Sequence, residues 1–189
     1  MKRQSNVQKK VVKLKDNHTW KAPNGYVVFV ADRGAVSFNM PEKWQVMKFE
    51  PVEIYDAVPP NDNVRLSMSY WRLPQGIDWS GLPQDQLLLS SIKTKRHERE
   101  GLLETSTISK FARTDLEILW VQSKFLDPVE KREAYSRVSI ARGWDVQVLI
   151  TFDFWVTDQA RVKGVWQEVM RSLQLGRVIQ DPTVGEIQH

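Results

Sequence analysis

Apolar and polar residues alternate along residues 64–71, where Val64, Leu66, Met68 and Tyr70 share one side of an extended chain. A period of two is typical of a half-buried β-strand. Runs of β-branched and aromatic residues between turn signals indicate six more strands. These predicted strands span residues 26–31, 35–40, 52–56, 116–125, 133–142 and 146–155.

Two segments have the spacing of helices. The clearer one follows Asp158, because apolar residues recur three and four positions apart across residues 162–173. Asp158 is the expected N-cap, and Gly176 suits the position just past the helix end. The second helix is predicted to begin near Pro83, since proline is favoured in the first turn.

The order of strands, helix, strands and helix predicts an α+β fold with a mostly antiparallel sheet flanked by helices. Short connections favour antiparallel pairing of the last three long strands. We expect one domain over residues 21–176, preceded by a basic flexible arm at 1–20 and followed by a tail at 177–189.

Charge is distributed unevenly along the chain. Six lysine and arginine residues precede Asp16, the first acid, while the rest of the chain holds the other 21 of 27 basic residues and all 23 acids. The body is therefore nearly neutral, which argues against specific nucleic-acid binding. The arm is expected to make a weak electrostatic contact with an anionic surface.

Composition narrows the class of protein further. Eight tryptophans in 189 residues supply a substantial core, and the absence of cysteine excludes disulfides and thiolate sites. No apolar run reaches the roughly 18–20 residues of a membrane span, and no secretory signal is visible. The sequence therefore predicts a cytoplasmic protein.

Familiar catalytic signatures are missing from the sequence. His18, His97 and His189 show no spacing typical of metal ligands, and there is no nucleophile elbow, phosphate loop or dinucleotide fingerprint. We therefore predict no catalytic residue, no metal and no cofactor, and a protein that is not an enzyme.

Three short stretches together resemble a known superfamily. They are Phe-Asn-Met-Pro-Glu-Lys-Trp at 38–44, Ile-Thr-Phe-Asp-Phe-Trp at 150–155, and the helix that ends in Ser-Leu-Gln-Leu at 172–175. The order of these stretches resembles that of the PsbP-like α/β/α sandwich, a fold shared with a Ran-binding release factor. Residues 71–83 and 127–142 are similar to uncharacterised cyanobacterial members. The resemblance implies protein binding and a link to photosynthetic or thylakoid-associated assemblies.

The last two predicted strands should pair as a hairpin. If residues 143–145 form a three-residue loop, Val138 lies opposite Ile150 and Ile140 opposite Val148. This register places apolar side chains against apolar side chains, as burial of one face requires.

The same register would assemble a polar cluster on the other face. Tyr135 lies opposite Asp153, and Arg137 lies diagonal to it at about 7–8 Å, within reach of a long side chain. The group is either a structural ion pair or a polar pocket that binds a small ligand or carries a cryptic hydrolytic activity. Its candidate residues are Arg132, Tyr135, Arg137, Asp153 and Trp155.

A second candidate site is aromatic. Trp71, Asp78 and Trp79 lie at the end of a strand and on the long loop that follows it. Tryptophan is enriched in interaction hot spots, and loops often carry function, although both rings could instead plug the end of the sheet. The leading hypothesis is a module that binds an unknown protein partner.

Overall fold

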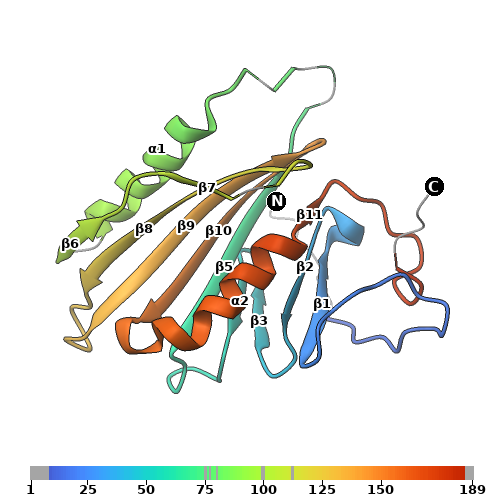
Figure 1. Ribbon diagram of the computed structural model, residues 1–189, viewed down its shortest axis with the longest axis horizontal. Helices are drawn as coiled ribbons and strands as arrows, with labels where there is room; N and C mark the ends of the chain where they lie inside the picture. The colour runs from blue at the N-terminus through green and yellow to red at the C-terminus, as the bar shows by residue number, and fades with distance from the viewer. Residues whose placement is uncertain are drawn as a thin grey trace, which may run out of the picture.

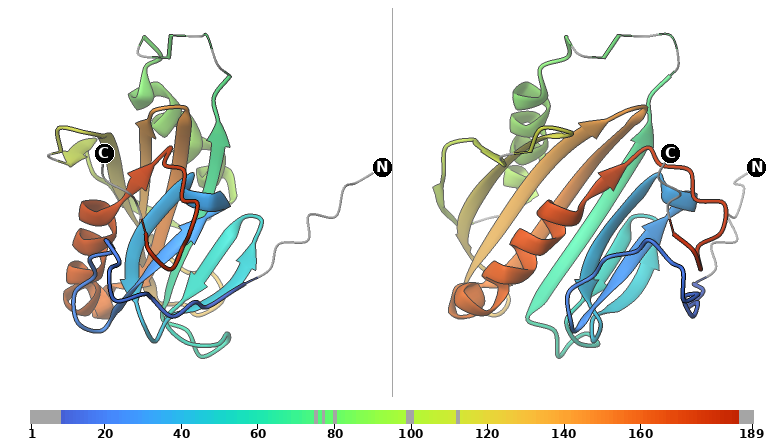
Figure 2. Two further views of the ribbon diagram at one scale, coloured as in Figure 1. Left: turned by 90° about the vertical axis from the view of Figure 1, so that its right-hand side faces the viewer. Right: turned by 45° about the vertical axis from the view of Figure 1, so that its right-hand side comes forward.

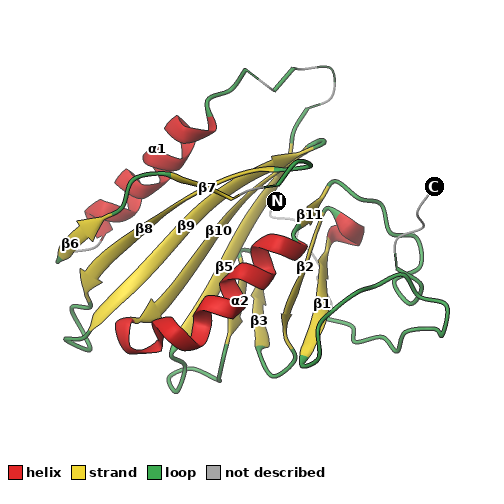
Figure 3. Cartoon of the chain, in the orientation of Figure 1, coloured by secondary structure: helices red, strands yellow, loops and turns green. Residues whose placement is uncertain are grey.

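The computed structural model describes residues 9–74, 76, 78, 79, 81–98, 101–111 and 113–185 of the chain. Two sheets and two helices form the fold, which Figure 1 and Figure 3 show from the same side. The α+β class and the mostly antiparallel pairing are confirmed.

The larger sheet has eight strands in the order β3-β4-β5-β10-β9-β8-β6, with β7 also paired to β8. Every pair in it is antiparallel. The strands are β3 (Gln45–Phe49), β4 (Val52–Tyr55), β5 (Val64–Arg72), β6 (Leu102–Thr105), β7 (Ser109–Phe111), β8 (Glu117–Leu126), β9 (Glu133–Gly143) and β10 (Val146–Trp155).

The smaller sheet joins the two ends of the chain. It consists of β1 (Tyr26–Ala31), β2 (Val36–Pro41) and the short strand β11 (Gln174–Leu175), with β2 in the middle. The helices are α1 (Gln84–Glu98) and α2 (Gln159–Ser172), and the short 3-10 turns are η1 (Asp32–Gly34) and η2 (Val156–Asp158).

Helix α2 and the smaller sheet cover one face of the larger sheet (Figure 2). Alternate residues of β10, from Val146 to Phe154, point into this main core, and all are at most 2% exposed. The apolar stripe of α2 meets them, so that Trp166 packs on Phe152 with ring centroids 5.5 Å apart. The apolar residues that alternate along β10 and those that form the stripe of α2 therefore pack against each other in one layer.

Helix α1 covers part of the opposite face. Leu88 is fully buried there in a second cluster with Val121, Val138 and Ile140. The larger sheet therefore has a core on each side, and helices lie on both of its faces. This arrangement makes the fold an α/β/α sandwich.

Some local predictions need correction. Strands β3, β6, β7 and β11 were not expected from the sequence. Asp158 precedes α2, but its side chain caps no backbone N–H, and it accepts from Nε of Arg161 at 2.8 Å instead. Gly176 adopts a positive φ of 68°, and a Cβ there would lie 2.6 Å from the Cβ of Trp144, so it lets two segments approach closely.

The arm and the tail lie against each other. The N–H of Lys15 donates to the carbonyl of Thr183 at 3.0 Å, and that of Thr19 donates to the carbonyl of Val184 at 2.8 Å. Nε1 of Trp20 donates to the carbonyl oxygen of Pro182 at 3.0 Å. Residues 15–20 of the predicted arm are therefore hydrogen-bonded to the predicted tail. The domain boundaries themselves stay a prediction.

Candidate functional site

The β9–β10 hairpin decides whether the predicted polar cluster exists. The turn has two residues, Trp144 and Asp145, and Val146 pairs with Gly143. The predicted three-residue loop is therefore wrong by one register step. Because side chains alternate between faces, this shift separates residues that were expected to lie together.

The observed register places the cluster on two faces. Arg137 lies opposite Phe152 and Tyr135 opposite Phe154, on the face that α2 covers. Asp153 lies opposite Ser136, on the other face. The predicted pocket of Arg137, Asp153 and Tyr135 therefore does not form.

Asp153 has a different arginine neighbour. It lies opposite Arg65 on β5, and Nε of Arg65 is 3.8 Å from its Oδ2. Nearby, the guanidinium of Arg132 stands 4.5 Å from the centre of the Trp155 ring. These two pairs are local contacts of the sheet surface.

Arg137 is enclosed by aromatic rings. It is 7% exposed, and its guanidinium carbon lies 5.1 Å from the centre of the Phe154 ring and 5.6 Å from those of Trp120 and Trp166. Its Nε donates to Oε1 of Gln122 at 2.8 Å. Burial lowers the pKa of the Arg137 guanidinium. We call this group the Arg137 cage.

Trp71 and Trp144 lie in neighbouring segments at one end of the larger sheet. Trp71 is 47% exposed near the end of β5, and Trp144 is 78% exposed in the β9–β10 turn. The two segments are neighbours, since the N–H of Leu73 donates to the carbonyl of Asp145 at 2.6 Å. Arg72 joins them by pairing with Asp145 at 3.2 Å.

The loop after β5 completes this end. Trp79 is partly exposed, and its Nε1 donates to the carbonyl of Pro74 at 3.1 Å. Nη1 of Arg142 donates to the carbonyls of Trp79 and Leu82, which holds the loop against the sheet. Asp78 is exposed beside Trp79. We call the end of the larger sheet that carries Trp71, Trp79 and Trp144 the tryptophan end.

Sequence reasoning missed Trp144, although a signal was available. A large aromatic residue at the tip of a short hairpin cannot be buried in the hairpin's own sheet, and Trp144 sits there with a positive φ of 54°. Backbone of that kind is uncommon outside glycine, asparagine and aspartate.

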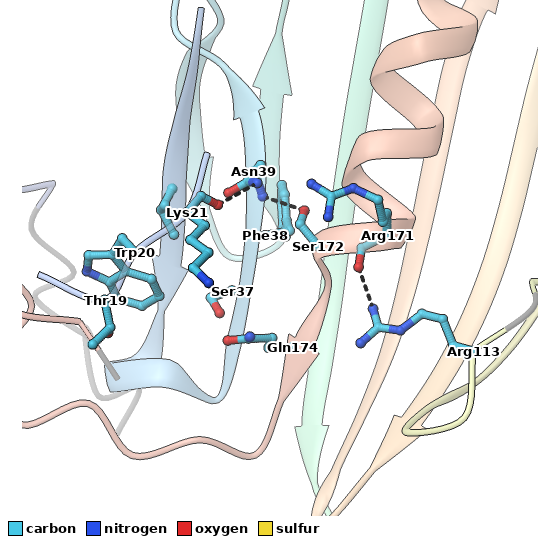
Figure 4. A pocket seen from close by; sticks show the side chains of 11 residues that line it. Thr19, Trp20, Lys21, Ser37, Phe38, Asn39, Arg113, Arg171, Ser172 and Gln174 are labelled. Carbon is cyan, nitrogen blue, oxygen red and sulfur yellow. Dashed lines mark hydrogen bonds between the residues drawn. The ribbon is translucent and has the colours of Figure 1, made fainter. Parts of the chain in front are cut away.

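A polar pocket of about 210 Å³ lies between the arm, the smaller sheet and the C-terminal end of α2 (Figure 4). We call it the arm pocket. Its lining residues are Thr19, Trp20, Lys21, Val28, Ser37, Phe38, Asn39, Arg113, Arg171, Ser172 and Gln174.

Hydrogen bonds fix the wall that α2 contributes to the arm pocket. Glu168 accepts from Nε and Nη2 of Arg171 at 2.8 and 2.7 Å, and from Nδ2 of Asn39 at 2.6 Å. The N–H of Asn39 donates to Oγ of Ser172 at 2.8 Å. Although partial burial raises the pKa of Glu168, the bonds from Arg171 and Asn39 hold it below its ordinary value.

Arg113 hydrogen-bonds to the backbone at the C-terminal end of α2. Its Nη1 donates to the carbonyls of Met170, Arg171 and Leu173 at 3.0, 3.1 and 2.6 Å. Its Nε and Nη2 both donate to Asp115, which lowers the pKa of that carboxyl. This pocket could not be predicted from the sequence, because its walls come from separate stretches at 19–21, 28, 37–39, 113 and 171–174.

Two further features of the described residues limit the chemistry of the site. Within the described ranges, no three His, Cys, Asp or Glu residues are grouped so that they could hold a metal ion. In the same part of the chain, neither helix combines the length and apolar character needed to cross a membrane.

Comparison with known proteins gives a family match and a fold match. A family model described as Alr1449 matches residues 27–179. The chain is 42% identical over 193 residues to uncharacterized protein alr1449 of Nostoc sp., covering 97% of this chain and 96% of that protein. The predicted likeness to uncharacterised cyanobacterial proteins is therefore confirmed.

Two solved structures show the fold. The solution structure of cyanobacterial PsbP (CyanoP) from Synechocystis sp. matches with a TM-score of 0.51 and 11% identity, over 82% of this chain and 95% of that one. A Bacteroides thetaiotaomicron crystal structure matches with a TM-score of 0.52 and 13% identity, over 79% of this chain and 48% of that one. At these identities the likeness concerns the fold, and it confirms the predicted PsbP-like architecture.

Proposed function

The chain belongs to the Alr1449 family, and we propose that it is a protein-binding module whose partner contacts the tryptophan end. The observation that carries this proposal is the exposure of Trp71 and Trp144 at one end of the sheet. Tryptophan is costly to leave in water, and it is among the residues that dominate interface hot spots.

The contacts of the segment that carries Trp144 favour binding of a partner protein. Trp144 lies in a turn tied to β5 by the Arg72–Asp145 pair, and its Cβ packs close to Gly176. Backbone held in this way loses little conformational freedom when a partner binds, which improves affinity.

We propose binding rather than catalysis. Two acids near the candidate sites are paired with arginines: Asp153 with Arg65, and Glu168 with Arg171. For Glu168 the balance of these effects is a lowered pKa. A carboxylate with a lowered pKa is a weak general base near neutral pH.

The PsbP-like fold indicates where a partner search should begin. We propose photosynthetic and thylakoid-associated assemblies as the first candidates, by resemblance of fold alone. A cytoplasmic location and a contact between the basic arm and an anionic surface stay predictions of the sequence. Fractionation of the host cell tests the first, and salt-dependent vesicle binding tests the second.

Paired variants test the proposed function. Trp71→Ser with Trp144→Ser removes both exposed rings, and Leu103→Ser with Val129→Ser removes two exposed apolar side chains from the other end of the sheet. Each tagged protein is used to capture partners from the host, and the affinity for the main captured protein is then measured. Both double variants should melt close to the parent temperature.

We expect the tryptophan variant to weaken that affinity by roughly 30-fold or more, as for hot-spot residues, and the control to leave it within about threefold. Equal losses in the two variants would show non-specific adhesion. Full affinity in the tryptophan variant would place the partner surface elsewhere.

A further inference from the structure

Several hydrogen-bonding groups of the arm pocket have no partner in the described part of the chain. They are the ammonium of Lys21, Nη1 of Arg171, the hydroxyl of Ser37 and the side-chain amide of Gln174. Figure 4 shows Lys21 extending toward Ser37 and Gln174, and the Arg171 guanidinium turned toward Ser172. Groups from separate elements therefore converge on one space.

The charge of this lining has one sign. Among the described residues, Lys21, Arg113 and Arg171 line the pocket, and no aspartate or glutamate does. Glu168 and Asp115 lie behind the two arginines and orient them, while the Lys21 ammonium forms no ion pair with the described residues. The space is thus rich in donors and carries an excess of positive charge.

Three apolar residues also line the pocket. They are Trp20, Val28 and Phe38. A volume of about 210 Å³ is smaller than the roughly 300–1,000 Å³ of sites for drug-sized ligands. The dimensions and lining suit a small molecule with an anionic group and a compact apolar body.

We propose that the arm pocket binds a small organic anion through a carboxylate or phosphate group. The ammonium of Lys21 and Nη1 of Arg171 hold the anionic oxygens, Ser37 and Gln174 supply further polar contacts, and Trp20 covers the apolar body. Charge-assisted hydrogen bonds of this kind are stronger than neutral ones. The site is separate from the tryptophan end and does not depend on its function.

Backbone amide shifts of the full-length protein test the proposal. Benzoate and phenyl phosphate are titrated as anionic probes, inorganic phosphate as the anion without an apolar body, and benzamide as the uncharged analogue of benzoate. We expect at least one organic anion to shift the amides of residues 19–21, 37–39 and 171–174 saturably. The stronger of benzoate and phenyl phosphate identifies the anionic group.

Two lysine variants make the test specific to the pocket. Lys21→Gln removes the pocket ammonium, and Lys13→Gln removes the same charge from an exposed part of the same arm. We expect about tenfold weaker binding for Lys21→Gln and no more than a twofold change for Lys13→Gln. Equal effects of the two variants, equal binding of benzamide, or no saturable shifts at the pocket would overturn the proposal.

Discussion

Arg113 and Arg137 both lie on the α2 side of the larger sheet, yet their charges are stabilised in different ways. Arg113 donates to three carbonyls at the C-terminal end of α2 and forms two bonds with Asp115. Arg137 is surrounded by three aromatic rings and bonds to the neutral side chain of Gln122. Arg113 thus hydrogen-bonds to backbone carbonyls, whereas Arg137 packs among aromatic side chains.

The two arginines therefore stabilise the fold in two different ways. Carbonyls at a helix end have no partner within the helix, so a cation that binds them secures the helix and the strand that follows. A guanidinium stacked among rings contributes chiefly by packing and by attraction to the ring faces. The Arg113 position should therefore require an arginine, whereas the Arg137 position should accept an apolar side chain of similar length.

The largest expected effect comes from removing the ring shared by the Arg137 cage and the main core. Trp166 is 4% exposed and packs against Trp120 and Phe152. Trp166→Ala should lower the free energy of unfolding by about 3–5 kcal/mol, as for other large-to-alanine core changes. Chemical denaturation measures this loss, and a change below about 1 kcal/mol would show that α2 is peripheral.

A smaller effect should distinguish the two arginines directly. Arg113→Met leaves three carbonyls without their donor and should cost about 2 kcal/mol. Arg137→Met retains most of the packing and should change the free energy of unfolding by less than about 1 kcal/mol, because apolar replacements of buried charges are often tolerated. Denaturation of both variants provides the comparison, with Asp115→Asn as the control for the exposed carboxylate.

The test is which of the two variants loses more free energy of unfolding. Equal losses for Arg113→Met and Arg137→Met would mean that the cage depends on charge as much as the helix end does. A loss confined to Arg137→Met would reverse the comparison and make the cage the more selective site.

Much of the fold could be predicted because its long elements follow one periodicity each. β1 and β10 have the expected bounds, and the stripe of α2 around Trp166 faces the core as expected. Strands β3, β6, β7 and β11 could not be predicted, since they are short and are stabilised by pairing with distant strands. Local sequence holds little information about such pairing.

The failure of the polar cluster has a specific cause. The predicted register assumed a single core, so that Val138 and Ile140 would face the same side as Ile150. Both sides of the sheet are buried. Val138 and Ile140 of β9 point toward α1, while Ile150 of β10 points toward α2. Apolar matching across a strand pair fixes register only when one face is buried.

The arm pocket could not be found from the sequence for a related reason. Lys21, Ser37, Arg113 and Arg171 lie in four segments that are far apart along the chain. None of them belongs to a recognisable motif. Only the fold brings them to one space.

The smallest expected effect concerns an exposed ion pair, which extends the comparison to the surface. Nζ of Lys15 lies 2.7 Å from Oδ2 of Asp181, and both side chains are about half exposed. Hydrogen bonds from Lys15 and Thr183 lower the pKa of Asp181 to about 2. A lowered pKa means that the contact stabilises the folded chain above the ordinary value of 3.8 and that this contribution is lost as the pH falls toward 2.

Lys15→Gln should raise the pKa of Asp181 toward 3.8 while leaving the melting temperature at pH 7 almost unchanged, because exposed pairs contribute little to stability. Carboxyl chemical shifts followed between pH 1.5 and 6 measure the pKa, and Lys13→Gln is the control, since it removes a nearby charge from the same arm. An unshifted Asp181 in the parent would show that the arm is not held at the tail in solution. A marked fall in melting temperature for Lys15→Gln would instead make this exposed pair as important to the fold as the bonds of Arg113.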